Sequence, residues 1–145
     1  MVKPLRPDWV EYWLGVAKAV SMRADCSRRQ VGAVIVDTDQ RVVSTGYNGG
    51  PSKGPSCLAG ECPRGQSTVE PGSSYDTGPG ACIALHAEQN AFLWGDVSRM
   101  QGGTLYITDA PCNGCYRMIQ GMPIDSVFWP KGSWFRNVPE SEQEN

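Results

Sequence analysis

Three side chains in the second half of the sequence have the types and spacing of a zinc site. Cys112 and Cys115 stand three residues apart after Pro111, and His86 lies upstream of them. Two cysteines at this spacing share one face of a helix, where the positive end of the helix dipole favours the thiolate form. Three protein ligands leave the fourth position of a tetrahedral zinc to water, whose pKa the metal lowers towards about 7.

Glu88, two residues after His86, is the candidate proton carrier for this water. Two thiolates and a neutral imidazole already neutralise Zn²⁺, so Glu88 is not needed as a ligand and is available as a general acid and base. His-Ala-Glu followed later by Pro-Cys-x-x-Cys is a pattern typical of zinc deaminases. The alternatives are a structural zinc knuckle, which would need a fourth protein ligand, and buried cysteines without metal.

The composition is that of a single globular domain. The chain has 145 residues, of which 40% are hydrophobic and 19% charged. Its net charge of −2 argues against a protein that holds long nucleic acid by its electrostatic field. No apolar run approaches the roughly 20 residues of a membrane helix, and the N-terminal stretch lacks the apolar core of a signal peptide. We therefore expect a cytoplasmic protein with neither membrane nor polynucleotide partners.

The hydrophobic pattern predicts helices and strands in alternation. A helix begins at Pro7 and Asp8, with Asp8 and Glu11 as a capping pair, and its apolar spacing continues to Val20. Strands over 31–36 and 41–46 form a hairpin around the turn 37–40. The pattern then predicts a helix from 86 to about 97, a strand over 104–108, a helix over 112–120 that ends at Gly121, and a strand over 124–129. This order indicates an α/β fold with helices on the faces of a sheet.

The predicted domain covers residues 1–136 and is followed by a polar tail over 137–145. Inside the domain, residues 47–81 have no periodicity and are rich in glycine and proline. Loops of this length are typically functional or disordered, and a bound metal would explain how this one stays ordered.

Four cysteines remain once the zinc trio is set aside: Cys26, Cys57, Cys62 and Cys82. Four thiolates are a donor set of closed structural zinc sites, so we predict a second, structural zinc. Buried free thiols are the alternative. A disulfide-bonded secreted scaffold is disfavoured, because such chains are usually shorter and carry a signal peptide.

These motifs resemble those of the cytidine deaminase superfamily, and within it the deoxycytidylate (dCMP) deaminases. The matching stretches cover most of the chain between Cys26 and Trp129: residues 30–34, 46–49, 86–91, 105–108 and 111–115. Gly-Tyr-Asn-Gly at 46–49, followed by Pro51, is the more discriminating part, since His-Ala-Glu is shared with tRNA adenosine deaminases.

The resemblance implies a three-layer α/β/α cytidine-deaminase-like fold, with a central mixed sheet, helices on both faces and both zinc half-motifs at helix starts. It also implies zinc-dependent hydrolysis of dCMP to dUMP and ammonia, which supplies dUMP for thymidylate synthesis. The residue matching Glu88 would carry the proton of the attacking water to N3 of cytosine and later to the departing amine. The amide of Ala87 would hold the base carbonyl, and Asn48 would contact the sugar.

Assembly and regulation also follow from the resemblance. Such enzymes are often hexamers that dCTP activates and dTTP inhibits, with an effector pocket near the Gly-Tyr-Asn-Gly stretch, which makes Tyr47 and Gly49 candidate effector contacts. Some members carry a second zinc with cysteines at positions like Cys26 and Cys57, and Cys62 and Cys82 would complete such a site here.

Further substrate contacts and two rival functions stay open. Arg28 and Arg29 are candidate donors to the 5′-phosphate, against two solvated arginines. Trp129 or Trp134 is a candidate to stack on the base, against an aromatic core residue. The rival functions are a deaminase that acts on a base within tRNA or single-stranded DNA, and a non-catalytic zinc-binding module.

Overall fold

A mixed five-stranded sheet forms the centre of the computed structural model, which describes residues 5–66 and 81–137. The strand order is β2-β1-β3-β4-β5, and only β3 and β4 pair in parallel. The strands are β1 (Gly32–Val36), β2 (Val42–Tyr47), β3 (Thr104–Ile107), β4 (Ser126–Trp129) and β5 (Gly132–Phe135). The predictions that concern 67–80 and 138–145 lie outside the described residues.

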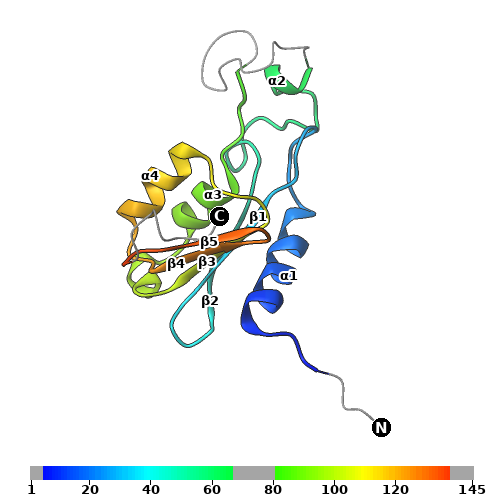
Figure 1. Ribbon diagram of the computed structural model, residues 1–145. Coiled ribbons are helices and arrows are strands. Elements are labelled where there is room, and N and C mark those ends of the chain that lie inside the picture. Colours follow the sequence, from blue (N-terminus) through cyan, green and yellow to red (C-terminus); the bar gives the residue numbers. More distant parts are fainter. Residues whose placement is uncertain (1–4, 67–80, 138–145) are drawn as a thin grey trace.

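Helices cover both faces of this sheet. α1 (Trp9–Ser21) lies on one face, and α3 (Ala87–Trp94) and α4 (Asn113–Gly121) lie on the other (Figure 1). α1 begins as predicted, because the carboxylate of Asp8 accepts a hydrogen bond from the backbone N–H of Glu11 at 2.8 Å. The predicted three-layer α/β/α architecture with a mixed sheet is confirmed.

The core is divided into two parts by the sheet, because successive side chains of a strand point to opposite faces. β1 is buried along its whole length, so its apolar residues serve both parts. Towards α1, Val34 and Val36 pack with Trp13 and Tyr106. Towards α3 and α4 the core contains Ala33, Ile35, Ala91, Leu105, Ile107, Ile119 and Val127.

The structure contains three elements that the sequence pattern did not predict. They are α2 (Pro63–Gln66), the 3₁₀ helix η1 (Val97–Met100) and β5. β5 follows β4 after the turn at 130–131 and forms an antiparallel hairpin with it. α3 ends at Trp94 rather than near Val97, since Gly95 follows in an extended conformation and Asp96 caps η1.

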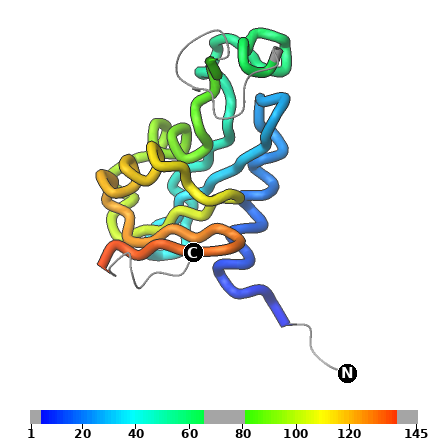
Figure 2. The backbone as a smooth tube through the Cα atoms, turned by 45° about the horizontal axis from the view of Figure 1, so that its top comes forward, coloured from blue at the N-terminus to red at the C-terminus, as the bar shows by residue number. Residues whose placement is uncertain are grey.

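Two loop regions extend beyond the end of the sheet at which β1 begins. One connects α1 to β1, and the other comprises residues 48–66, which include α2, and residues 81–86, which lead into α3 (Figures 1 and 2). An isolated bridge between Gly49 and Leu85 ties the two ends of the longer loop together. The two loops bring Cys57 next to Ser27. The backbone nitrogen of Ser27 lies 3.3 Å from the sulfur of Cys57.

The close packing of α3 on β2 depends on the absence of a side chain at Gly46. A Cβ atom there would lie 2.2 Å from the carbonyl oxygen of Ala87 and 2.4 Å from the nitrogen of Ala91. We expect Gly46→Ala to lower the free energy of unfolding by about 2–3 kcal/mol, as overpacked cores do. Chemical denaturation measures the change.

Gly15 provides the matched control, because a Cβ atom at this position in α1 would meet nothing within 4 Å. Gly15→Ala is expected to raise the free energy of unfolding by about 0.5–1 kcal/mol through helix propensity. Equal effects of the two substitutions would contradict the packing of α3 on β2.

Candidate active site

The three predicted metal ligands stand at the starts of two neighbouring helices. His86 is the residue before α3, and its backbone N–H donates to the side-chain oxygen of Gln89 at 2.7 Å. Cys112 is the residue before α4, and its sulfur accepts a hydrogen bond from the backbone N–H of Cys115 at 3.5 Å. The position of Cys112 at the start of a helix, which the sequence predicted, is confirmed.

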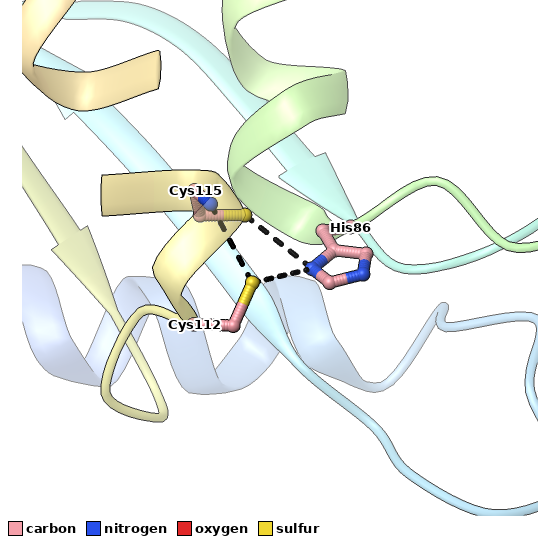
Figure 3. Close-up of side chains that lie close together, drawn as sticks. All are labelled: His86, Cys112 and Cys115. Atoms are coloured by element: carbon pink, nitrogen blue, oxygen red, sulfur yellow. Dashed lines mark hydrogen bonds between the residues drawn. The ribbon is translucent and has the colours of Figure 1, made fainter. Parts of the chain in front are cut away.

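The side chains of this trio converge on one point (Figure 3). Nδ1 of His86 lies 3.3 Å from the sulfur of Cys115 and 3.5 Å from the sulfur of Cys112. All three donor atoms lie within 4.8 Å of one another, and no other group of three potential ligands meets this condition among residues 5–66 and 81–137. One imidazole nitrogen and two sulfurs are the donor types that zinc prefers, so the residues fit the metal.

Exposure differs strongly within the trio. Cys115 is fully buried, whereas His86 and Cys112 are exposed. Burial raises the pKa of the Cys115 thiol, and the neighbouring Glu88 and Cys112 raise it further. A bound cation would reverse this effect by stabilising the thiolate. A metal at this site would therefore be held by a buried thiolate and open to solvent on the side of the other two ligands.

Glu88 is buried at the second position of α3, with 3% of its surface exposed. Burial raises the pKa of its carboxyl group. Hydrogen bonds from its own backbone amide and from Cys115, together with the nearby His86 and Arg29, act in the opposite direction. The carboxyl group thus lies against the metal trio, where it can exchange a proton with a group bound there.

Ala87 and Asn48, the predicted base and sugar contacts, are both buried. Ala87 is the first residue of α3 and is fully buried. The side chain of Asn48 accepts a hydrogen bond from the backbone N–H of Val31 at 2.8 Å and donates one to the carbonyl oxygen of Arg29 at 3.0 Å. Asn48 therefore also fastens the chain segment that leads into β1.

The two predicted phosphate contacts have different surroundings. The guanidinium of Arg29 forms a salt bridge of 2.8 Å with the carboxylate of Asp109. Arg28 is exposed, and its backbone N–H, like that of Arg29, lies 3.4 Å from the sulfur of Cys26. Sequence reasoning missed Asp109, although an acidic residue three positions before Cys112 was a visible signal.

Trp129 and Trp134 lie in the core between the sheet and the helices α3 and α4. They are 8% and 5% exposed, respectively. The guanidinium of Arg136 lies over the ring of Trp134 at 5.1 Å. In this structure both rings pack as core residues, and base stacking by either one stays a prediction.

Tyr47 and Gly49 line a separate pocket of about 560 Å³. Arg23 and Lys53 add positive charge to its wall, and Trp94 adds an aromatic ring. The side-chain amide of Asn90, two residues after Glu88 on α3, donates to the carbonyl oxygen of Tyr47 at 2.8 Å. The pocket is thus connected to the helix that carries the candidate catalytic carboxylate.

The remaining four cysteines lie in the two loops beyond the sheet. The sulfurs of Cys62 and Cys82 are 3.9 Å apart, and Cys57 and Cys62 are almost fully buried. Burial acts to raise the pKa of Cys62, but backbone N–H groups outweigh it and leave the pKa below its usual value. Burial raises the pKa of Cys82, which the adjacent Cys62 and Cys26 raise further.

Comparison with known proteins connects this geometry to a family. The model of the cytidine and deoxycytidylate deaminase zinc-binding region matches residues 7–130.

No helix in the described part of the chain is long and apolar enough to cross a membrane.

Individual relatives agree with this match. The chain is 47% identical over 129 residues to deoxycytidylate deaminase of Mycobacterium phage D29, covering 88% of this chain and 98% of the phage protein. It is 37% identical over 125 residues to deoxycytidylate deaminase of Schizosaccharomyces pombe, covering 86% of this chain and 37% of the yeast protein. The dCMP deaminase of cyanophage S-TIM5, crystallised with dCMP and dUMP, superposes with a TM-score of 0.63 at 29% identity over 87% of this chain and 83% of that one. The chain therefore belongs to the family of cytidine and deoxycytidylate deaminases that share this zinc-binding region.

Proposed function

We propose that this protein hydrolyses dCMP to dUMP and ammonia and so supplies dUMP for thymidylate synthesis. The observation that carries the proposal is the convergence of His86, Cys112 and Cys115 with the buried carboxyl group of Glu88 beside them. A purely structural zinc site does not require such a carboxylate beside its ligands, and it would have a fourth protein ligand. The phage relative and the cyanophage structure support the choice of dCMP among cytosine-containing substrates.

The residues divide the chemistry between them. His86, Cys112 and Cys115 would hold zinc, which when bound supplies a water molecule that is acidic enough to react at neutral pH. Glu88 takes one proton from the attacking water and delivers it to N3 of cytosine. It then takes the water's second proton from the new hydroxyl group on C4 and transfers it to the amine, which leaves as ammonia while the C4 carbonyl forms. The backbone amide of Ala87, at the positive end of α3, binds the base carbonyl. Water and dCMP thus give dUMP and ammonia.

Phosphate recognition is assigned to Arg29 in this proposal. Two observations support this assignment: its guanidinium pairs with Asp109, three residues before Cys112, and its charge acts to lower the pKa of Glu88. Arginine is well suited to this role because its planar group carries several N–H donors for phosphate oxygens. Asn48 holds the backbone of Arg29 and contributes to binding of the sugar.

An ammonia-release assay tests the proposed reaction. We expect turnover of dCMP at a kcat/KM at least tenfold above that for deoxycytidine or for a single-stranded oligonucleotide that contains cytosine. Phosphate binding provides the physical reason for the difference from deoxycytidine. Preferred turnover of the oligonucleotide would favour the nucleic-acid deaminase instead, and an absence of turnover with all three substrates would favour the non-catalytic zinc module.

A second metal is proposed for Cys26, Cys57, Cys62 and Cys82. Cys62 and Cys82 are in contact, and backbone N–H groups approach the other sulfurs: Ser27 approaches Cys57 at 3.3 Å, and Arg28 and Arg29 approach Cys26 at 3.4 Å. Four cysteine sulfurs in these two loops match the donor set of a closed structural zinc site.

The metal content of the purified protein tests this second site. We expect two zinc ions per chain in the unmodified protein and one in the Cys62→Ser variant, because three thiolates hold a structural ion less tightly than four. Mass spectrometry under native conditions measures the count. One zinc ion per unmodified chain would reject the site.

Regulation by nucleotides is proposed for the pocket lined by Tyr47 and Gly49, with dCTP as activator and dTTP as inhibitor. Arg23 and Lys53 supply charges that suit a triphosphate. Trp94 and Leu58 at this pocket are 71% and 64% exposed, which suits burial in a hexamer. We expect the Arg23→Ala variant to lose its activation by dCTP while it retains dCMP turnover, as an ammonia-release assay with and without dCTP would measure.

Cytoplasmic localisation stays a prediction.

A further inference from the structure

The salt bridge between Arg29 and Asp109 joins two segments that lie 80 residues apart in the sequence. The Nη2 atom of Arg29 lies 2.8 Å from a carboxylate oxygen of Asp109. The pairing of β1 with β3 brings these segments together, because Thr108 exchanges hydrogen bonds with Gly32 just beyond the ladder. Asp109 then leads directly into Pro111 and the ligand Cys112.

The backbone of Arg29 is fixed separately from its side chain. Its carbonyl oxygen accepts a hydrogen bond from Asn48, and its N–H points at the sulfur of Cys26. A long arginine side chain on a fixed backbone still has several rotatable bonds, and ordering it costs free energy. The carboxylate of Asp109, three residues before Cys112, is one group that restrains the guanidinium, through the 2.8 Å ion pair.

We propose that Asp109 is a positioning residue, which orients the guanidinium of Arg29 so that it receives the 5′-phosphate of the substrate. The inference rests on the proposed dCMP deaminase function. Asp109 itself does not touch the reacting atoms. Its effect is to set the preference for a nucleoside monophosphate over the corresponding nucleoside.

The physical basis is preorganisation of the anion site. A guanidinium carries five N–H donors, so a carboxylate at one edge leaves the group with the geometry to bind a phosphate oxygen at another. A side chain that is already oriented loses less entropy when the phosphate binds. Because 61% of the Arg29 side chain and 47% of the Asp109 side chain are exposed, we expect a moderate effect.

Kinetics with and without the phosphate test the proposal on the full chain. We expect Asp109→Ala to lower kcat/KM for dCMP about fivefold to tenfold and to change kcat/KM for deoxycytidine less than twofold. Asp109→Asn retains an acceptor oxygen for Arg29 and is expected to recover most of the loss. In an Arg29→Ala background, Asp109→Ala should have no further effect on dCMP, since the two residues act through one interaction.

The affinity for dUMP supplies a second measurement in case deoxycytidine turnover is too slow to follow. Isothermal calorimetry should show the same fivefold to tenfold weakening in Asp109→Ala, without a change in the thermal unfolding midpoint. Arg99→Ala is the matched control, because Arg99 forms a 3.5 Å ion pair with Asp37 beyond the opposite end of β1. This variant should behave like the unmodified protein with both substrates.

The alternative outcomes separate the inference from the function on which it rests. Equal losses of kcat/KM with dCMP and deoxycytidine in Asp109→Ala would mean that Asp109 merely stabilises the loop. An unchanged kcat/KM for dCMP would mean that the charge of Asp109 plays no part, and a higher one would mean that this charge repels the phosphate. Any of these results overturns the inference while the dCMP deaminase function stands. An unmodified protein without dCMP turnover would overturn both.

Discussion

Replacement of Glu88 by glutamine is expected to lower the rate of dCMP deamination by at least about 10²–10⁴-fold while the protein keeps its metal. Glutamine has nearly the same shape as glutamate but cannot accept and return a proton at neutral pH. Glu88 is 3% exposed and lies against Cys115, so its carboxyl group is held at the metal trio, where it can transfer protons to and from a bound group. Ammonia release under saturating dCMP measures the rate, and zinc analysis of the same sample measures the metal.

Glu11→Gln is the matched control for this experiment. Glu11 lies in the exposed first turn of α1, on the opposite face of the sheet from α3. The control should retain the rate of the unmodified protein. A Glu88→Gln variant with near-normal turnover would rule out the carboxylate as the proton carrier, whereas a variant that had lost zinc would show that Glu88 supports the metal site instead.

Replacement of Cys115 by serine is expected to remove one zinc ion per chain and to abolish turnover, with a loss of at least about 10³-fold. Cys115 is the fully buried member of the trio, and its sulfur lies 3.3 Å from Nδ1 of His86. A serine hydroxyl is a much poorer zinc ligand than a thiolate, because it is not deprotonated at neutral pH. Zinc analysis and the ammonia assay measure the two effects.

Cys62→Ser supplies the contrast, since this residue lies in the loop region beyond the sheet rather than in the trio. Each substitution should remove a different zinc ion, and a variant with both substitutions should contain none. Full turnover by Cys115→Ser would contradict the assignment of the catalytic metal. Loss of both ions in Cys115→Ser alone would show that the two sites do not form independently.

The residues of the metal trio were predictable because local sequence positions them. His86 and Cys112 precede helices, and Cys115 follows Cys112 by one helical turn, so short patterns indicate both the residues and their placement. The layers of the fold were predictable for a similar reason. Apolar residues at helical or strand spacing show which face of each element is buried.

The contacts around the trio depend on residues far apart in the chain. The register of β1 against β3 brings Arg29 to Asp109 across 80 positions. The side-chain amide of Asn48 forms hydrogen bonds with the backbone of Arg29 and Val31. No short sequence pattern indicates these hydrogen bonds. The burial of Trp129 and Trp134 likewise follows from their places on β4 and β5 beneath α3 and α4.

The sequence by itself indicated the candidate zinc ligands and the candidate proton carrier, since such residues are recognised by side-chain type and by spacing within one turn of a helix. Tertiary structure alone decided which charged group stands beside the candidate phosphate-binding arginine and which aromatic rings are withdrawn into the core. The physical reason is that strand register and helix packing are set by the burial of the whole sheet, to which many distant residues each contribute a small part.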